Sequence, residues 1–116
     1  MIDRRAHAAA KRRAFRSLHD AGCFVIPNPW DVGGVRFLQS LGFKALATTS
    51  SGHARSQGLA DGAVPLGGVL AHLRQIVEAT VLPLNADFGN GFWPHAVGVE
   101  AHVALAIETG MAGVSI

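Results

Sequence analysis

Short, uniformly apolar runs alternate with helical patterns along this chain of 116 residues. Strands are predicted over residues 23–26, 44–48, 82–86 and 111–116, and helices over residues 35–41, 69–79 and 96–109. Because the strands are apolar throughout, we expect helices to cover the sheet, which is typical of parallel strands. Parallel strands are joined by right-handed crossovers, so the pattern predicts an α/β fold.

Two architectures satisfy this pattern, a closed (β/α)8 barrel and an open doubly wound sheet. A barrel typically takes about 250 residues, so this chain would form about half of one. We predict a single partial domain, which in the barrel case is the amino-terminal half of a TIM barrel. A leading basic helix covers residues 1–22, and residues 23–116 form the first four βα units, which stop in the fourth strand.

Composition excludes several classes of protein. A hydrophobic content of 49% with 16% charged residues describes a globular interior. The lone Cys23 excludes an internal disulfide, and no apolar stretch approaches the roughly 20 residues that cross a bilayer. We therefore expect a cytoplasmic protein with no membrane partner.

Six of the ten Lys and Arg residues lie within residues 1–22. Such a segment could be a transit peptide or a nucleic-acid arm. Apolar residues recur in it near helical spacing, however, and aromatic residues are not regularly interleaved with the charges, since Phe15 is the single aromatic among them. We predict a solvated helix that ends near Gly22, and no nucleic-acid partner.

The connection over residues 49–65 (TSSGHARSQGLADGAVP) is unusually long. The usual βα loop has about two to six residues, and longer loops in compact domains usually carry a binding function. The alternative is a surface insertion without a function.

Polar residues follow the predicted strands, and the carboxyl ends of parallel strands meet on one face. These residues include Trp30 and Asp31 after the first strand, Ser50, Ser51 and Gly52 after the second, and Asp87 after the third. A serine hydroxyl with consecutive backbone N–H groups, as at residues 51–53, can bind a carboxylate or phosphonate.

Asp87 is followed closely by Gly89 and Gly91, which let the backbone approach a ligand. Its carboxylate can bind a divalent cation, through waters as magnesium prefers. Asp61 could add a second carboxylate if its loop folds back. The alternative for Asp87 is an ordinary polar strand end before a glycine turn.

Other common motifs are absent from the sequence. There is no HxxxH or HExxH pair for zinc, and no P-loop, GxGxxG or GxSxG segment. His53 stands apart from the other histidines because it lies in the proposed anion-binding segment, although it could equally face solvent.

Four segments together resemble the isocitrate lyase and phosphoenolpyruvate mutase superfamily, in particular its small lyase/mutase-like branch. The resemblance runs from about Leu18 to the last residue, and the order and spacing of the segments are more specific than any one motif. The segments are residues 24–31 (FVIPNPWD), 45–52 (ALATTSSG), 58–61 (GLAD) and 82–92 (LPLNADFGNGF).

The resemblance implies a (β/α)8 barrel that forms homo-oligomers and uses Mg²⁺. It implies a short 2-oxo acid or a related carboxylate or phosphonate as substrate, and C–C or P–C bond chemistry through an enolate. Ser51, Gly52 and His53 match the segment that holds the substrate's anionic group. Asp61 matches an acidic catalytic residue of the active-site loop, and Asp87 matches the first carboxylate of a DxD or DxE metal motif. Trp30 and Asp31 are expected to contact the substrate.

The chain departs from the family pattern in its metal motif. If Asp87 is the first carboxylate, the second position is Gly89; if Asn85 is the first position, Asp87 is the second. Either register leaves one carboxylate, so we expect a weakened or absent magnesium site.

Further catalytic residues of the family would follow Ile116. We therefore expect a fragment of a Mg²⁺-dependent lyase/mutase-like enzyme that is inactive alone. The alternative is a degenerate, non-catalytic homologue that binds small anions.

Overall fold

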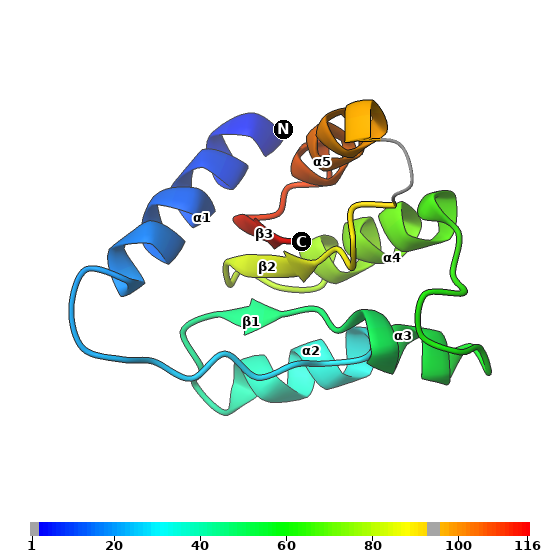
Figure 1. The fold of residues 1–116 in the computed structure, drawn as a ribbon. Helices are drawn as coiled ribbons and strands as arrows, with labels where there is room; N and C mark the ends of the chain where they lie inside the picture. Colours follow the sequence, from blue (N-terminus) through cyan, green and yellow to red (C-terminus); the bar gives the residue numbers. More distant parts are fainter. Residues whose placement is uncertain (1–2, 93–95) are drawn as a thin grey trace.

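A three-stranded parallel sheet organises the fold in the computed structural model, which describes residues 3–92 and 96–116 (Figure 1). Its strands are β1 (Leu46–Ala47), β2 (Leu84–Asp87) and β3 (Gly113–Ser115). They lie side by side in the order of the chain, with Leu46 opposite Leu84 and Asn85 opposite Gly113. A doubly wound sheet reverses its strand order after the first βαβ units, whereas a barrel does not. The sequential order therefore favours part of a barrel.

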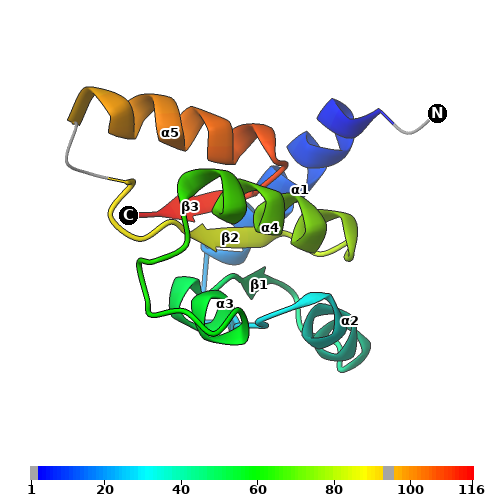
Figure 2. The ribbon, with the colours of Figure 1, turned by 90° about the vertical axis from the view of Figure 1, so that its right-hand side faces the viewer.

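The described residues form five helices. They are α1 (Arg4–Leu18), α2 (Val32–Ser40), α3 (Ser50–Ser56), α4 (Leu66–Glu78) and α5 (Ala96–Glu108). Helix α4 packs against both α2 and α5, so these three helices form one continuous layer (Figures 1 and 2). None of the helices in residues 3–92 and 96–116 has the length and apolar character needed to cross a bilayer.

The core lies between this helical layer and the sheet. Helix α4 buries Leu73 and Ile76, which belong to the same cluster as Leu84 and Ala86 of β2. Leu73 and Ile76 are three residues apart, a helical spacing that places them on one face of the helix predicted over residues 69–79. Gly110 has a positive φ of 102° just after α5, a conformation that glycine adopts without strain and that ends the helix predicted over residues 96–109.

The segment before α2 differs from the sequence prediction of a strand at residues 23–26. No strand is assigned there; the chain is irregular, and the Pro27 carbonyl accepts a hydrogen bond from Ala47 N at 3.1 Å. This segment therefore lies along the free edge of β1. Pro27 and Pro29 have no N–H group to donate to a strand ladder, which explains why regular pairing does not develop.

The long connection after β1 also differs from the prediction, because it contains α3. Thr49 caps this helix: its Oγ1 accepts a hydrogen bond from Gly52 N at 3.1 Å. Such a cap supplies one of the acceptors that the first turn of a helix otherwise lacks. The connection is thus a short helix followed by an exposed turn around Asp61.

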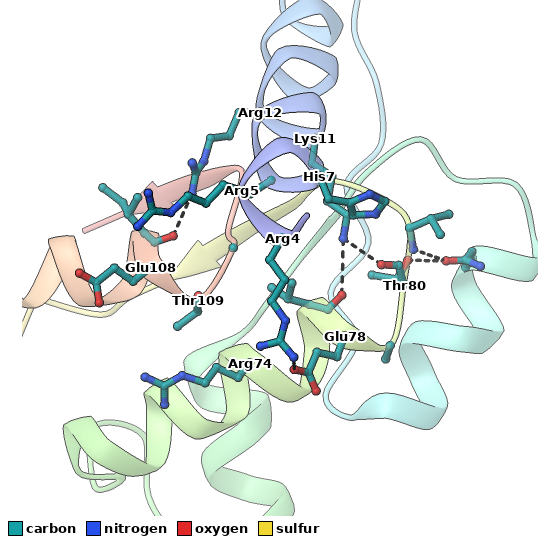
Figure 3. Close-up of a pocket in the computed structure, with 17 residues that line it drawn as sticks. Arg4, Arg5, His7, Lys11, Arg12, Arg74, Glu78, Thr80, Glu108 and Thr109 are labelled. Atoms are coloured by element: carbon teal, nitrogen blue, oxygen red, sulfur yellow. Dashed lines mark hydrogen bonds and ion pairs between the residues drawn. The ribbon is translucent and has the colours of Figure 1, made fainter. Parts of the chain in front are cut away.

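Helix α1 lies across the amino-terminal ends of the strands (Figure 1). Lys11 is buried, and its Nζ donates to the carbonyls of Thr80 at 2.9 Å and Val77 at 3.5 Å. Arg12 donates to the carbonyl of Met111 at 3.1 Å and to the carbonyl of Ile107 at 2.9 Å, and Figure 3 draws the second of these bonds.

Val77 and Ile107 lie in the last turns of α4 and α5, where unpaired carbonyls and the helix dipole attract cations. The leading helix, predicted as solvated, therefore uses two of its basic side chains for docking. Burial lowers the pKa of Lys11 from its usual value.

We predict that Lys11→Ala lowers the free energy of unfolding by about 2 kcal/mol, because charged hydrogen bonds to two carbonyls are lost. Arg13→Ala on the exposed side of the same helix is the matched control and should change it by less than about 0.5 kcal/mol. Urea denaturation measures both values. Equal effects of the two substitutions would show that Lys11 does not anchor α1.

Candidate active site

The carboxylate of Asp87 lies at the carboxyl end of β2 and is held by several hydrogen bonds. Its Oδ2 accepts from the backbone N and from the Oγ of Ser50, both at 2.9 Å. Its Oδ1 accepts from Gly89 N at 3.2 Å, and its own backbone N donates to the buried Thr48 Oγ1 at 3.0 Å. Asp87 therefore ties the end of the sheet to the first residue of α3.

A second carboxylate reaches the same hydroxyl. Ser50 Oγ lies 3.1 Å from Asp61 Oδ1, so Asp61 and Asp87 both lie within hydrogen-bond distance of one O–H group. A serine hydroxyl has a single proton and donates it to one acceptor at a time. Within the part of the chain that the structure describes, neither carboxylate forms an ion pair with a basic side chain. This arrangement of negative charge attracts a cation or a proton.

These residues line a cavity of about 430 Å³. Ser50, Asp61 and Asp87 supply its polar side, and Val64, Val69 and Phe92 supply apolar surface. This volume lies in the range typical of small-molecule sites, where a few polar groups orient the ligand within apolar walls. The cavity has the size and polarity to hold a small acid.

Phe92 shapes one wall of this cavity. It adopts a φ of 65°, which is uncommon for an aromatic residue, and its ring packs edge-on against the buried Phe88 with centroids 5.1 Å apart. The backbone N of Phe92 donates to Asn90 Oδ1 at 3.0 Å. These two contacts hold the turn that follows Asp87.

The predicted anion-binding residues Ser51, Gly52 and His53 lie in α3 and not in an open loop. The N–H groups of Gly52 and His53 already donate to Thr49, through its Oγ1 and its carbonyl oxygen respectively. The structure therefore brings these residues close to Asp87 but uses two of their backbone donors for the helix cap.

Trp30 and Asp31, predicted as substrate contacts, lie outside the lining of this cavity. Asp31 is the cap of α2: its Oδ1 accepts from Gly34 N at 2.7 Å. Trp30 is half exposed and packs over Gly52, where a Cβ atom would lie only 2.4 Å from the indole ring. The close approach of Trp30 to α3 requires a glycine at this position.

His53 extends away from the Thr49 cap and stacks on His72 of α4, with ring centroids 3.7 Å apart and an angle of 13° between the rings. Burial lowers the pKa of His53 from its usual value. His53 therefore connects α3 to α4.

Ser50 is the site residue whose role the sequence did not reveal. The segment offers two adjacent serines, and the hydroxyl role was assigned to Ser51. The choice depends on where α3 begins: Thr49 is its cap, so Ser50 is the first helical residue and donates to Asp87. The threonine before the serine pair was the only signal of this start.

A second, larger cavity of about 1360 Å³ lies between α1 and the carboxyl-terminal ends of α4 and α5 (Figure 3). Its lining carries both signs of charge, including Arg4 and Glu78, which approach each other to 3.9 Å. Lys11 and Arg12 in this lining already donate to helix carbonyls. This cavity lies at the amino-terminal ends of the strands, opposite to the end where α/β barrels place their chemistry.

Comparison with known proteins shows the family of this chain. The family model described as phosphoenolpyruvate phosphomutase matches residues 15–116. The chain belongs to the phosphoenolpyruvate phosphomutase family. This confirms the superfamily indicated by the four sequence segments, and the structural relatives are TIM-barrel proteins, which confirms the fold class.

The similar proteins are longer than this chain. An uncharacterized protein of Mycobacterium tuberculosis (strain H37Rv) is 30% identical over 99 residues, which are 84% of this chain and 38% of that protein. A protein of Burkholderia cenocepacia J2315, whose crystal structure is provisionally named a lyase/mutase, is 45% identical in sequence to this chain, with a TM-score of 0.92. The match covers 95% of this chain and 40% of that protein.

An oxaloacetate acetylhydrolase in complex with its product oxalate is 27% identical with a TM-score of 0.79, over 93% of this chain and 38% of that one. This chain thus spans about two fifths of the length of these family members.

We predict that Gly52→Ala destabilises the protein by about 1–3 kcal/mol, because the new methyl group would collide with Trp30 and Thr49. Gly67→Ala is the matched control: it lies in α4 with no atom within 4 Å of its Cβ position, and should leave stability unchanged or raise it by up to about 1 kcal/mol. Thermal unfolding followed by circular dichroism measures both variants. A Gly52→Ala variant as stable as the wild type would show that Trp30 does not pack on α3.

Proposed function

We propose that the cavity at the end of β2 binds a small 2-oxo acid, or a related carboxylate or phosphonate, together with Mg²⁺. In the full-length protein this site would form or break a C–C or P–C bond. The observation that carries the proposal is the meeting of Asp87 and Asp61 on the Ser50 hydroxyl beside this cavity. Membership of the phosphoenolpyruvate phosphomutase family supports the class of reaction.

The residues at this site fit a magnesium ion that is coordinated partly by the protein and partly by the bound substrate. Asp87 and Asp61 offer hard oxygen donors close together. No group of three or more His, Cys, Asp or Glu side chains able to hold a metal occurs among the described residues. Magnesium usually keeps several waters and binds one or two carboxylates plus oxygens of the substrate. Asp87 would hold the ion, with water and substrate oxygens as its other ligands, so the affinity of the site for Mg²⁺ without substrate would be low.

Bound Mg²⁺ would supply positive charge beside the oxygen on which negative charge develops during the reaction. In this proposal Ser50 orients Asp87, through both its N–H and its hydroxyl. Asp61 lies in the exposed turn over the cavity, where its carboxylate can accept or return a proton at the substrate.

Of the three predicted anion-binding residues, Ser51 keeps a backbone N–H and a hydroxyl that the Thr49 cap does not use, so Ser51 would hold the anionic end of the substrate, while Gly52 and His53 would shape this turn of α3. Trp30 and Asp31 would contribute at the outer edge of the site. Val64, Val69 and Phe92 would limit the substrate to a short chain and exclude water from one side of it.

A non-catalytic anion-binding protein is the second candidate. It is favoured by one observation: Gly89 stands two residues after Asp87, where a second metal-binding carboxylate would stand in one register of the family motif. Such a protein would bind a small acid whether or not metal is present.

We predict that oxalate binds this chain more tightly with Mg²⁺ than without it, since the ion and the acid complete each other's coordination. Asp87→Asn should weaken Mg²⁺-dependent oxalate binding at least tenfold, whereas Asp20→Asn, an exposed carboxylate beyond α1, should leave it unchanged. Isothermal titration calorimetry with and without MgCl₂ measures the affinities. Oxalate affinity that changes neither with MgCl₂ nor with Asp87→Asn would favour the second candidate. Absence of oxalate binding would contradict both candidate functions.

We also predict that Gly89→Asp tightens Mg²⁺ binding several-fold by adding a second carboxylate. Position 89 has room, because no atom lies within 4 Å of the added Cβ, but its φ of 59° strains any side chain. Gly89→Asn is the matched control, since asparagine tolerates this conformation about as well as aspartate but carries no charge. Equal Mg²⁺ affinity in the two variants would show that position 89 does not face the ion.

A further inference from the structure

His72 is an unusual residue in the middle of α4. Its side chain is only 6% exposed, and the other buried residues of this helix, Leu70, Leu73 and Ile76, are apolar core residues. Its Nε2 is buried and has no hydrogen-bond partner among the residues that the structure describes. An unpaired buried nitrogen costs free energy, so packing must compensate for it.

The principal aromatic partner of His72 is His53. The two rings are nearly parallel at 3.7 Å, so the imidazole of α3 lies flat on that of α4. His53 lies three residues after Ser50, which binds Asp87, and one residue after Gly52, which lies beneath Trp30. Helix α3 is thus attached at three points: Ser50 on β2, Gly52 under Trp30, and His53 on α4.

The charge state of His72 determines whether this stack persists. A protonated imidazole has two N–H donors, and the buried Nε2 of His72 has no acceptor in reach within residues 3–92 and 96–116. Two charged groups act on His72: His53 on α3, which opposes its protonation, and Asp31 at the start of α2, which favours it. Burial has the largest effect and, with His53, lowers the pKa of His72 to about 4.

We propose that the His53–His72 stack is a positioning contact that holds α3, and with it the Ser50 hydrogen bonds to Asp87, in place only while His72 is uncharged. His72 acts through α3 and is not itself one of the residues that line the cavity. Acidification would force the ring of His72 to gain a proton that its buried site cannot solvate, and the stack would open. The site would therefore lose its Ser50 contact in acid before the core of the sheet unfolds.

The direction of the pH dependence follows from the lowered pKa. The native state keeps His72 neutral at pH values where the unfolded chain, with an ordinary pKa near 6.5, already binds a proton. Stability from this group is fully present above about pH 6.5 and is lost as the pH falls toward about 4.

Amide NMR of the ligand-free chain between pH 7 and pH 3, a range that spans the pKa of His72 at about 4, tests the proposal and needs no assumption about substrate or metal. In the wild type, the Ser50 amide signal should move with the same midpoint as the His72 ring protons, while the amide of the buried Ala86 in β2 stays unchanged. In His72→Phe, which keeps a stacked and buried ring that cannot titrate, the Ser50 signal should lose this pH-dependent step and stay at its neutral-pH position.

His72→Leu keeps a buried apolar side chain but removes the stacked ring, so it separates the effect of stacking from the effect of burial. It also provides the test if the His72→Phe variant does not fold. It should show a displaced Ser50 signal at every pH, without the step. His7→Gln, on the exposed surface of α1, is the control and should behave as the wild type. A Ser50 step that persists with the same midpoint in the folded His72 variants would overturn the proposal, as would a wild-type Ser50 signal that does not respond while His72 titrates.

Discussion

The hydrogen bonds from Ser50 to Asp87 are the contact on which the rest of the site depends. Both Ser50 donors meet a single carboxylate oxygen, which fixes the start of α3 against the end of β2. That position in turn brings the turn with Asp61 over the cavity, because Asp61 shares the same hydroxyl. Charge-assisted hydrogen bonds of this kind are stronger than neutral ones, so one carboxylate can organise both a backbone junction and a binding site.

The two ends of the sheet use charge in opposite ways. At the amino-terminal ends of the strands, Lys11 and Arg12 donate hydrogen bonds to carbonyl oxygens at the ends of α4 and α5, so these two charged side chains attach α1 to the domain. At the carboxyl end, Asp61 and Asp87 have no basic partner among the described residues. Negative charge left unpaired in a cavity is available to bind a cation and the cation's substrate. This arrangement matches the usual division of an α/β barrel into one face that stabilises the fold and one that carries the chemistry.

Regular elements with strong periodicity could be predicted from the sequence. The apolar stripe of α4 and the run that forms β2 came directly from residue spacing, and the family resemblance placed Asp87 and Asp61 at one site. The prediction of a strand at residues 23–26 was wrong, because it relied on apolar composition and gave no weight to the nearby prolines, which prevent regular pairing. Helix α3 was not predicted, since a helix of seven residues with an internal glycine gives almost no periodic signal. The role of Ser50 and the stack of His53 on His72 depend on where that helix begins and what it packs against, which are tertiary facts.

A double-mutant cycle on Ser50 and Asp87 tests the central claim most directly. The free energies of unfolding of Ser50→Ala, Asp87→Ala and the double variant, measured in urea, give the coupling between the two side chains. This account predicts a coupling of about 1 kcal/mol or more, because the hydroxyl and the carboxylate are direct partners. Additive effects, within about 0.3–0.5 kcal/mol, would contradict it and would remove the physical basis for placing α3 and the cavity around Asp87.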